Sequence, residues 1–99
     1  MYWGDPDTYG FFILDQARRV LPGLRSILMD EATLLAYRSL WGQEPQQCPD
    51  GELALLEPGE RAVYQALRQN RFGPNVRLEQ ERLPWGLAVS ALRQALEGS

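Results

Sequence analysis

Residues 2–11 read YWGDPDTYGF, and this stretch sets the expectation for the whole fold. Two aromatic residues before a cluster of Gly, Asp and Pro are typical of a buried strand that enters a turn. From residue 11 to 21, apolar positions recur at helical spacing, and the polar residues at 15, 16, 18 and 19 fall on an opposite, solvated face. Asp7 or Thr8 is a suitable N-cap for this helix. The sequence therefore predicts a strand, an acidic turn and a helix.

A second copy of this order follows directly. Residues 25–29 form a short apolar run that suits a strand buried on both faces, and Asp30 is placed to cap a helix over about residues 31–41. Strands that alternate with helices over short links predict parallel pairing and right-handed crossovers. We therefore expect an α/β fold, an open sheet of parallel strands flanked by helices.

The chain is expected to form a single domain of three parts. Residues 1–42 carry the two strand-helix units, and residues 43–57 are predicted to be a polar surface loop. Residues 58–99 are predicted to hold a helix, a short acidic strand at 76–80 and a last helix at 85–97 with a broad apolar face.

Composition narrows the chemistry that this chain can perform. It contains no histidine, its ten basic residues are all arginine, and its one cysteine is Cys48. Nucleophiles that depend on histidine, a Schiff-base lysine and a disulfide framework are therefore excluded. A net charge of −3 argues against a stand-alone nucleic-acid binder. Because neither a membrane span nor a signal peptide is recognisable, we expect a cytoplasmic protein. If the chain catalyses a reaction, we expect its carboxylates to do so, because histidine and lysine are absent.

Asp5 and Asp7 lie two residues apart, where the first strand is expected to end and the helix to begin. Ligands bind at this edge of open α/β sheets. Two carboxylates there suit Mg²⁺, which takes one or two carboxylates together with water and phosphate oxygens and can serve phosphodiester chemistry. Asp and Pro before a helix also cap it and complement its dipole. The spacing alone leaves both interpretations open.

The full string around these aspartates resembles a known family. Residues 4–10 resemble the DxD motif of Toprim domains, in particular those of topoisomerase VI A subunits and meiotic double-strand-break proteins. The string at 2–11, with SILMD at 26–30 and RLEQER at 77–82, is more similar still to the C-terminal Toprim-like domain of JetD, the nuclease subunit of the Wadjet plasmid-defence system. The resemblance runs from residue 2 to about residue 96.

The resemblance implies a domain that cleaves DNA with Mg²⁺ or Mn²⁺ and works beside a condensin-like SMC complex. Carried over by motif, Asp5 and Asp7 are metal ligands and catalytic residues, and Glu79 is a further acidic residue of the catalytic site. Additional candidates for the site are Glu81, Arg77 and Tyr9. An exposed strand of alternating charge explains residues 76–82 equally well, so that alternative stays open.

One part of the Toprim pattern is missing from this sequence. Toprim sites pair the DxD with a glutamate on an earlier strand, and here only Met1 precedes Tyr2. We therefore expect a Toprim-like fold truncated at its N-terminus, with little or no nuclease activity in the isolated chain. The alternative function is a non-catalytic interaction module, in which the acidic turn only caps a helix. The apolar face of residues 85–96 would then bind a second copy of the chain or a full-length partner.

Overall fold

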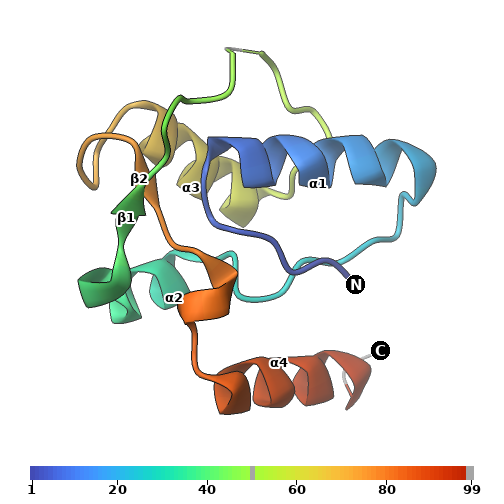
Figure 1. Ribbon diagram of the computed structural model, residues 1–99. Helices are drawn as coiled ribbons and strands as arrows, with labels where there is room; N and C mark the ends of the chain where they lie inside the picture. Colours follow the sequence, from blue (N-terminus) through green and yellow to red (C-terminus); the bar gives the residue numbers. More distant parts are fainter. Residues whose placement is uncertain (50, 98–99) are drawn as a thin grey trace.

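The computed structural model describes residues 1–49 and 51–97. Over these residues the chain is mainly helical, with one two-stranded sheet (Figure 1). In chain order the elements are α1 (Thr8–Val20), α2 (Glu31–Ala36), the 3-10 helix η1 (Arg38–Leu40), β1 (Gly42–Gln43), α3 (Pro58–Arg68), β2 (Val76–Arg77), the 3-10 helix η2 (Gln80–Arg82) and α4 (Trp85–Glu97).

The prediction of an α/β, Toprim-like open sheet with parallel strands is wrong. The described part of the chain has one sheet, in which β1 and β2 run antiparallel with Gly42 opposite Arg77. The two segments expected as neighbouring parallel strands meet only at an isolated parallel bridge between Tyr2 and Ser26. The direction of that contact is as predicted, but no parallel sheet grows from it.

The backbone of residues 25–29 explains why the parallel pairing stops after one bridge. The Tyr2 N–H donates to the Arg25 carbonyl at 2.7 Å, and the Ile27 N–H donates to the Tyr2 carbonyl at 2.9 Å. The next residue, Leu28, has φ 59°, which lies in the left-handed region and cannot belong to an extended strand. The run is also not buried on both faces as predicted, because Arg25 is exposed and only Met29 of its five residues is buried.

The predicted helices are confirmed, with changes at some of their ends. The Asp7 side chain accepts a hydrogen bond from the Gly10 N–H at 2.5 Å, so α1 begins at Thr8. Asp30 caps α2 in the same way, accepting from the Thr33 N–H at 2.8 Å. α2 ends at Ala36 rather than near residue 41, because Tyr37 leaves helical geometry with φ −112° and ψ 33°. α3 and α4 lie where the sequence places them.

The core lies between α1 and α3, which pack side by side (Figure 1). Phe11 of α1 and Tyr64 of α3 meet edge to face, with ring centroids 6.3 Å apart. α4 lies below the other helices in Figure 1, and Ala88 is its buried residue. None of the helices in the described ranges is long and apolar enough to cross a membrane.

A buried ion pair ties α1 to α3. The Arg18 guanidinium faces the Glu60 carboxylate with both nitrogens, and the Nη2–Oε2 distance is 3.0 Å. Both side chains are almost fully buried. The other hydrogen bonds of the pair involve the carbonyls of Leu24 and Leu55, the Ser26 hydroxyl and the Glu57 N–H. Since the buried charges have counter-charges and hydrogen-bond partners, the pair is tolerated inside the fold.

Gly10 allows the acidic turn to approach the first turn of α1. A Cβ at this position would lie 1.8 Å from the main-chain oxygen of Asp5. Alanine usually favours a helix over glycine by about 1 kcal/mol, but here the clash should reverse the sign. We expect Gly10→Ala to lower the free energy of unfolding by about 1–3 kcal/mol, measured by urea denaturation followed by circular dichroism.

The matched control for this prediction is Gly86→Ala in α4. A Cβ at Gly86 meets nothing within 4 Å, so this substitution should leave stability unchanged or raise it. Equal stability gains at Gly10 and Gly86 would show that the acidic turn does not pack tightly against α1.

Candidate functional site

Acidic side chains from three parts of the chain gather near the N-terminal end of α1. Asp5 and Asp7 directly precede the helix, and Glu44 follows β1 and contacts the first residues of α1. The segment 79–81 reaches the same place, because the Gln80 N–H donates to Asp5 Oδ1 at 2.8 Å. The structure therefore brings Asp5 beside the segment that carries Glu79 and Glu81, which the sequence could not establish.

Glu44 is the member of this cluster that sequence reasoning missed. It was expected in a surface loop, but its residue exposure is only 3%. Its carboxylate accepts hydrogen bonds from the Thr8 hydroxyl at 2.9 Å and from the Tyr9 N–H at 3.0 Å. The first N–H groups of a helix lack intrahelical partners and favour a negative charge. Glu44 thus supplies a second cap for α1 from 35 residues away in sequence.

β1 and β2 position Glu44 at this helix end. The Glu44 N–H donates to the Asn75 carbonyl at 2.7 Å, which extends the contact between the two strands by one residue. No local motif marks Glu44, because its neighbours are Gln43 and Pro45 and its partners are distant in sequence. Only the tertiary structure reveals its place in the site.

Asp7 is the most perturbed carboxyl group of the cluster. Burial raises the pKa of Asp7 to about 7, although the hydrogen bond from the Gly10 N–H acts to lower it. The negative charges of Glu44 and Asp5 raise this pKa further, and Arg77 lowers it. A carboxyl group that titrates near neutral pH, beside other carboxylates, is a recognised signature of a functional site.

The residues around β2 do not form the strand that was predicted over 76–80. β2 ends at Arg77, and η2 occupies residues 80–82. Arg77 Nη2 lies 3.3 Å from Glu79 Oε1 in a partly exposed ion pair. A hydrogen bond with Glu81 lowers the pKa of Glu79, and the charge of Arg77 lowers it further. The same hydrogen bond raises the pKa of Glu81, and repulsion from Glu79 and Asp5 adds to the rise.

Two further residues border the cluster. Tyr9 is 39% exposed, so its ring lies at the surface beside the capped helix end. Cys48 is buried, and its N–H donates to the Thr8 hydroxyl at 2.8 Å. Burial raises the pKa of the Cys48 thiol, which opposes formation of the reactive thiolate.

Asp5 and Asp7 carry carboxylate oxygens, which are the type of ligand that a hard cation prefers. Asp5 and Asp7 each use Oδ1 to accept a main-chain N–H, and no described residue donates a hydrogen bond to either Oδ2. Mg²⁺ commonly binds one or two carboxylates and completes its shell with water and phosphate oxygens. Over residues 1–49 and 51–97, however, no group of three or more His, Cys, Asp or Glu side chains is arranged to hold a metal. Within the described residues, the carboxylates therefore do not form a complete protein cage for a metal ion.

Comparison with known proteins gives one family. The family model described as "Wadjet protein JetD, C-terminal" matches residues 1–92. No curated protein matches the chain. The matched region contains every acidic residue of the cluster at the N-terminal end of α1.

Proposed function

The chain belongs to the family of C-terminal regions of the Wadjet protein JetD, and we propose that within Wadjet plasmid defence it is the metal-binding part of a DNA endonuclease. The observation that supports this most is the gathering of Asp5, Asp7 and Glu44 at one helix end. Burial together with repulsion from Glu44 and Asp5 raises the pKa of Asp7 to about 7. A divalent cation beside these groups would relieve that repulsion and favour the ionised form of Asp7.

In this proposal, the carboxylates of Asp5 and Asp7 would hold Mg²⁺ or Mn²⁺. When bound, the cation supplies an activated water and neutralises charge on the phosphodiester. The hydrogen bonds from the N–H groups of Gln80 and Gly10 fix the Oδ1 atoms and so orient both carboxylates. Glu79 is a further acidic group at the edge of the site. Glu79 interacts there with Glu81 and Arg77. Tyr9 lies at the same end of α1, where its N–H donates to Glu44. The partners of the complete nuclease are DNA and a condensin-like SMC complex.

Titration of the chain with Mn²⁺, followed by calorimetry, tests the two-aspartate site. We expect saturable binding whose affinity falls by about tenfold or more in Asp5→Asn and in Asp7→Asn, because each change removes an anionic ligand. Asp30→Asn is the matched control, since it alters the exposed N-cap of α2, and it should bind as the wild type does. Absent binding in the wild type, or binding that survives both site variants, would contradict the proposal.

Cleavage by the chain alone is a separate part of this prediction. Because the described residues offer no three-ligand group, we expect little or no nicking of circular plasmid DNA with Mg²⁺ or Mn²⁺. Robust nicking that disappears in Asp5→Ala would show that the isolated chain is a nuclease after all.

An interaction module is the second candidate function, and the exposed apolar side chains of α4 favour it. Four apolar side chains of α4 are exposed, and Trp85 is 75% and Leu96 is 63% exposed. An apolar cavity of about 210 Å³ lies between α4 and residues 1–3. A concentration-dependent dimer without saturable Mn²⁺ binding would favour this module over the metal site.

A further inference from the structure

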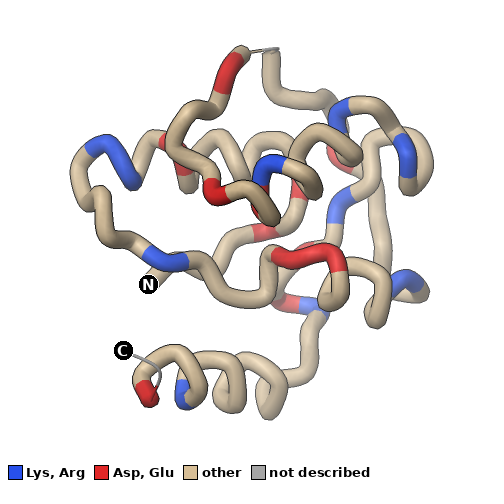
Figure 2. The backbone as a smooth tube through the Cα atoms, turned by 180° about the vertical axis from the view of Figure 1, so that it is seen from behind, with Lys and Arg blue, Asp and Glu red and all other residues tan. Residues whose placement is uncertain are grey.

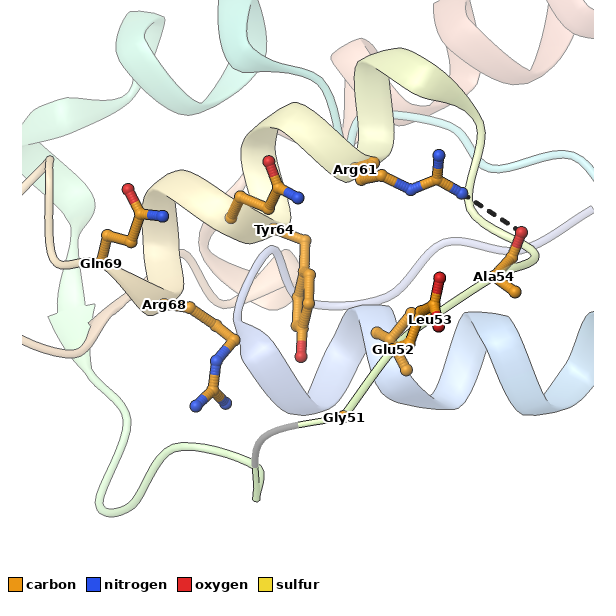
Figure 3. Close-up of a pocket in the computed structure, with 9 residues that line it drawn as sticks. Gly51, Glu52, Leu53, Ala54, Arg61, Tyr64, Arg68 and Gln69 are labelled. Carbon is orange, nitrogen blue, oxygen red and sulfur yellow. Dashed lines mark hydrogen bonds between the residues drawn. The ribbon is translucent and has the colours of Figure 1, made fainter.

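We propose that the cavity between α1 and residues 48–49 and 51–53 binds an unpaired, amino-bearing base of a DNA strand, with Asp15 as the acceptor for its amino group. The inference rests on the proposed function, because it names the part of the DNA that the chain recognises beside the acidic cluster. The cavity has a volume of about 410 Å³, which is within the usual range for a small-molecule site. Residues 51–53 also line a second cavity, on the side of α3 (Figure 3). The α1 wall of the proposed site consists of Tyr9, Phe12, Asp15, Gln16 and Arg19.

Asp15 is a buried acidic residue of this wall. Its side chain is fully buried, and Oδ1 accepts the Leu55 N–H at 2.9 Å. Oδ2 accepts no hydrogen bond within the described part of the chain, although Arg19 Nη2 lies 3.6 Å from it. Because Arg19 already supplies a counter-charge, Oδ2 lacks a hydrogen-bond donor rather than a cation. A buried polar atom without a donor is unfavourable, so a ligand that donates to Oδ2 gains from the contact.

Arg19 is the residue that must move to admit a ligand to Oδ2. Its side chain is 58% exposed, and exposed side chains change rotamer readily. Once displaced toward solvent, its guanidinium remains a donor at the cavity, as does the Gln16 amide. A carboxylate acceptor with N–H donors beside it matches the pairing edge of cytosine or adenine, where an amino group adjoins an unprotonated ring nitrogen.

Two aromatic side chains of α1 supply a stacking surface for such a base. Tyr9 is 39% exposed and Phe12 is 37% exposed, and both line the cavity. Since they are three residues apart, they share one face of the helix, and Asp15 follows after another three. Unpaired bases of any identity stack on aromatic side chains. The rings therefore supply affinity, and Asp15 supplies the preference for an amino group.

The charge of the chain favours recognition of a base over recognition of the phosphate backbone. The net charge is −3, and Figure 2 shows acidic and basic residues interspersed along the backbone. Among the described lining residues, the charged ones are Asp15, Arg19 and Glu52. Phosphate binding relies on an excess of positive charge. Stacking and a hydrogen bond from a neutral amino group do not need one.

The cavity adjoins the acidic cluster at the N-terminal end of α1. Tyr9 lines the cavity, and its N–H donates to Glu44 at 3.0 Å. Cys48 lines it as well, and its N–H donates to the Thr8 hydroxyl at 2.8 Å. Asp15 is six residues after Tyr9, which corresponds to about 9 Å along the helix axis. A base in the cavity would therefore belong to a nucleotide close to the phosphate at the proposed metal site.

Fluorescence anisotropy in EDTA, with labelled oligodeoxycytidine and oligodeoxyuridine, tests the cavity without any metal. The two bases share one ring, but cytosine carries an amino group where uracil carries an oxygen. We expect the wild type to bind oligodeoxycytidine about tenfold more tightly, because only cytosine can donate to Oδ2 from that position. Asp15→Asn can place an amide N–H where Oδ2 was, so it should abolish or reverse this preference. Asp30→Asn, at an exposed aspartate outside the cavity lining, should keep it.

The stacking surface is tested by Tyr9→Leu and Phe12→Leu. Each should weaken the binding of both oligonucleotides by about fivefold or more, because stacking serves either base. The control is Trp85→Leu, which removes an exposed aromatic ring of α4 that does not line the cavity. Circular dichroism of each variant checks that the fold is retained.

Equal affinity of the wild type for the two oligonucleotides would overturn the inference, as would an unchanged preference in folded Asp15→Asn. Binding of free deoxycytidine monophosphate as tight as that of oligodeoxycytidine would overturn the assignment to a DNA strand. Because EDTA removes divalent cations, the result is independent of Mn²⁺ binding at Asp5 and Asp7. Base-selective binding without Mn²⁺ binding would contradict the proposed metal site and support the cavity, and the reverse result would contradict the cavity alone.

Discussion

Arg18→Met is expected to lower the free energy of unfolding by about 3–5 kcal/mol, because it leaves the Glu60 carboxylate buried without its counter-charge. The substitution also removes the donors that satisfy the carbonyls of Leu24 and Leu55. Stabilities of small domains are about 5–15 kcal/mol, so this loss is a large fraction of the total. Urea denaturation at pH 7 measures it.

Two further variants separate the buried pair from the effect of losing an arginine. Arg93→Met, at an exposed position of α4, should change stability by less than about 0.5 kcal/mol. Arg18→Met combined with Glu60→Met should be more stable than Arg18→Met alone, since an apolar pair replaces a lone buried charge. Arg18→Met as mild as Arg93→Met would show that the pair contributes little to stability.

The pH dependence of stability gives an independent test of the Arg18–Glu60 pair. Burial raises the pKa of Glu60, but hydrogen bonds from Arg18, Ser26 and the Glu57 N–H outweigh burial and hold the pKa below its ordinary value of 4.5. The ionised form is therefore more favourable in the folded chain than in the unfolded chain. Its contribution is complete above about pH 4.5 and disappears as the pH falls through the folded pKa. This acid-induced loss should be absent when Glu60 is replaced by Met.

The sequence predicted features whose partners are close along the chain. The caps at Asp7 and Asp30 each bond an N–H three residues ahead, so their geometry follows from local sequence. The sheet could not be predicted in this way, because one residue in left-handed geometry, Leu28, ends the parallel pairing. The polar face of α1 was predicted to be solvated, yet Asp15 and Arg18 are buried there, because α3 and the loop before it supply their partners.

The candidate site shows the same division between near and distant partners. The pair Asp5 and Asp7 was visible in the sequence because spacing and turn chemistry mark it. Glu44 was not, since its bonds to Thr8 and Tyr9 cross about a third of the chain. The contact between Asp5 and the Gln80 N–H spans 75 residues and depends on the turn after β2. Such contacts follow from packing rather than from any pattern along the chain.

Asp7→Asn is expected to raise the free energy of unfolding at pH 8 by about 2–4 kcal/mol, although it alters a helix cap. Asparagine caps helices about as well as aspartate, and its Oδ1 can still accept the Gly10 N–H. What the substitution removes is a buried negative charge repelled by Glu44 and Asp5. A shift from 3.8 to about 7 corresponds to roughly 4 kcal/mol, at about 1.4 kcal/mol for each pKa unit.

The sign of the pH dependence follows from the raised pKa. The folded chain binds the Asp7 proton more tightly than the unfolded chain does, so wild-type stability should fall as the pH rises from 3.8 to about 7. Above that range the loss is complete, and in Asp7→Asn it should be absent. The Glu60 contribution changes below about pH 4.5, so a comparison of pH 5 with pH 8 isolates Asp7.

Urea denaturation of the wild type and Asp7→Asn at pH 5 and pH 8 measures the effect, with Asp30→Asn as the control. Asp30 caps α2 at an exposed position, so its replacement should change stability by less than about 0.5 kcal/mol at either pH. A wild type that is equally stable at both pH values would show that the pKa of Asp7 is not perturbed.

A residue that weakens the fold when ionised is typical of functional sites, where activity is retained at the expense of stability. Mn²⁺ should therefore stabilise the wild type at pH 8 and leave Asp7→Asn unchanged.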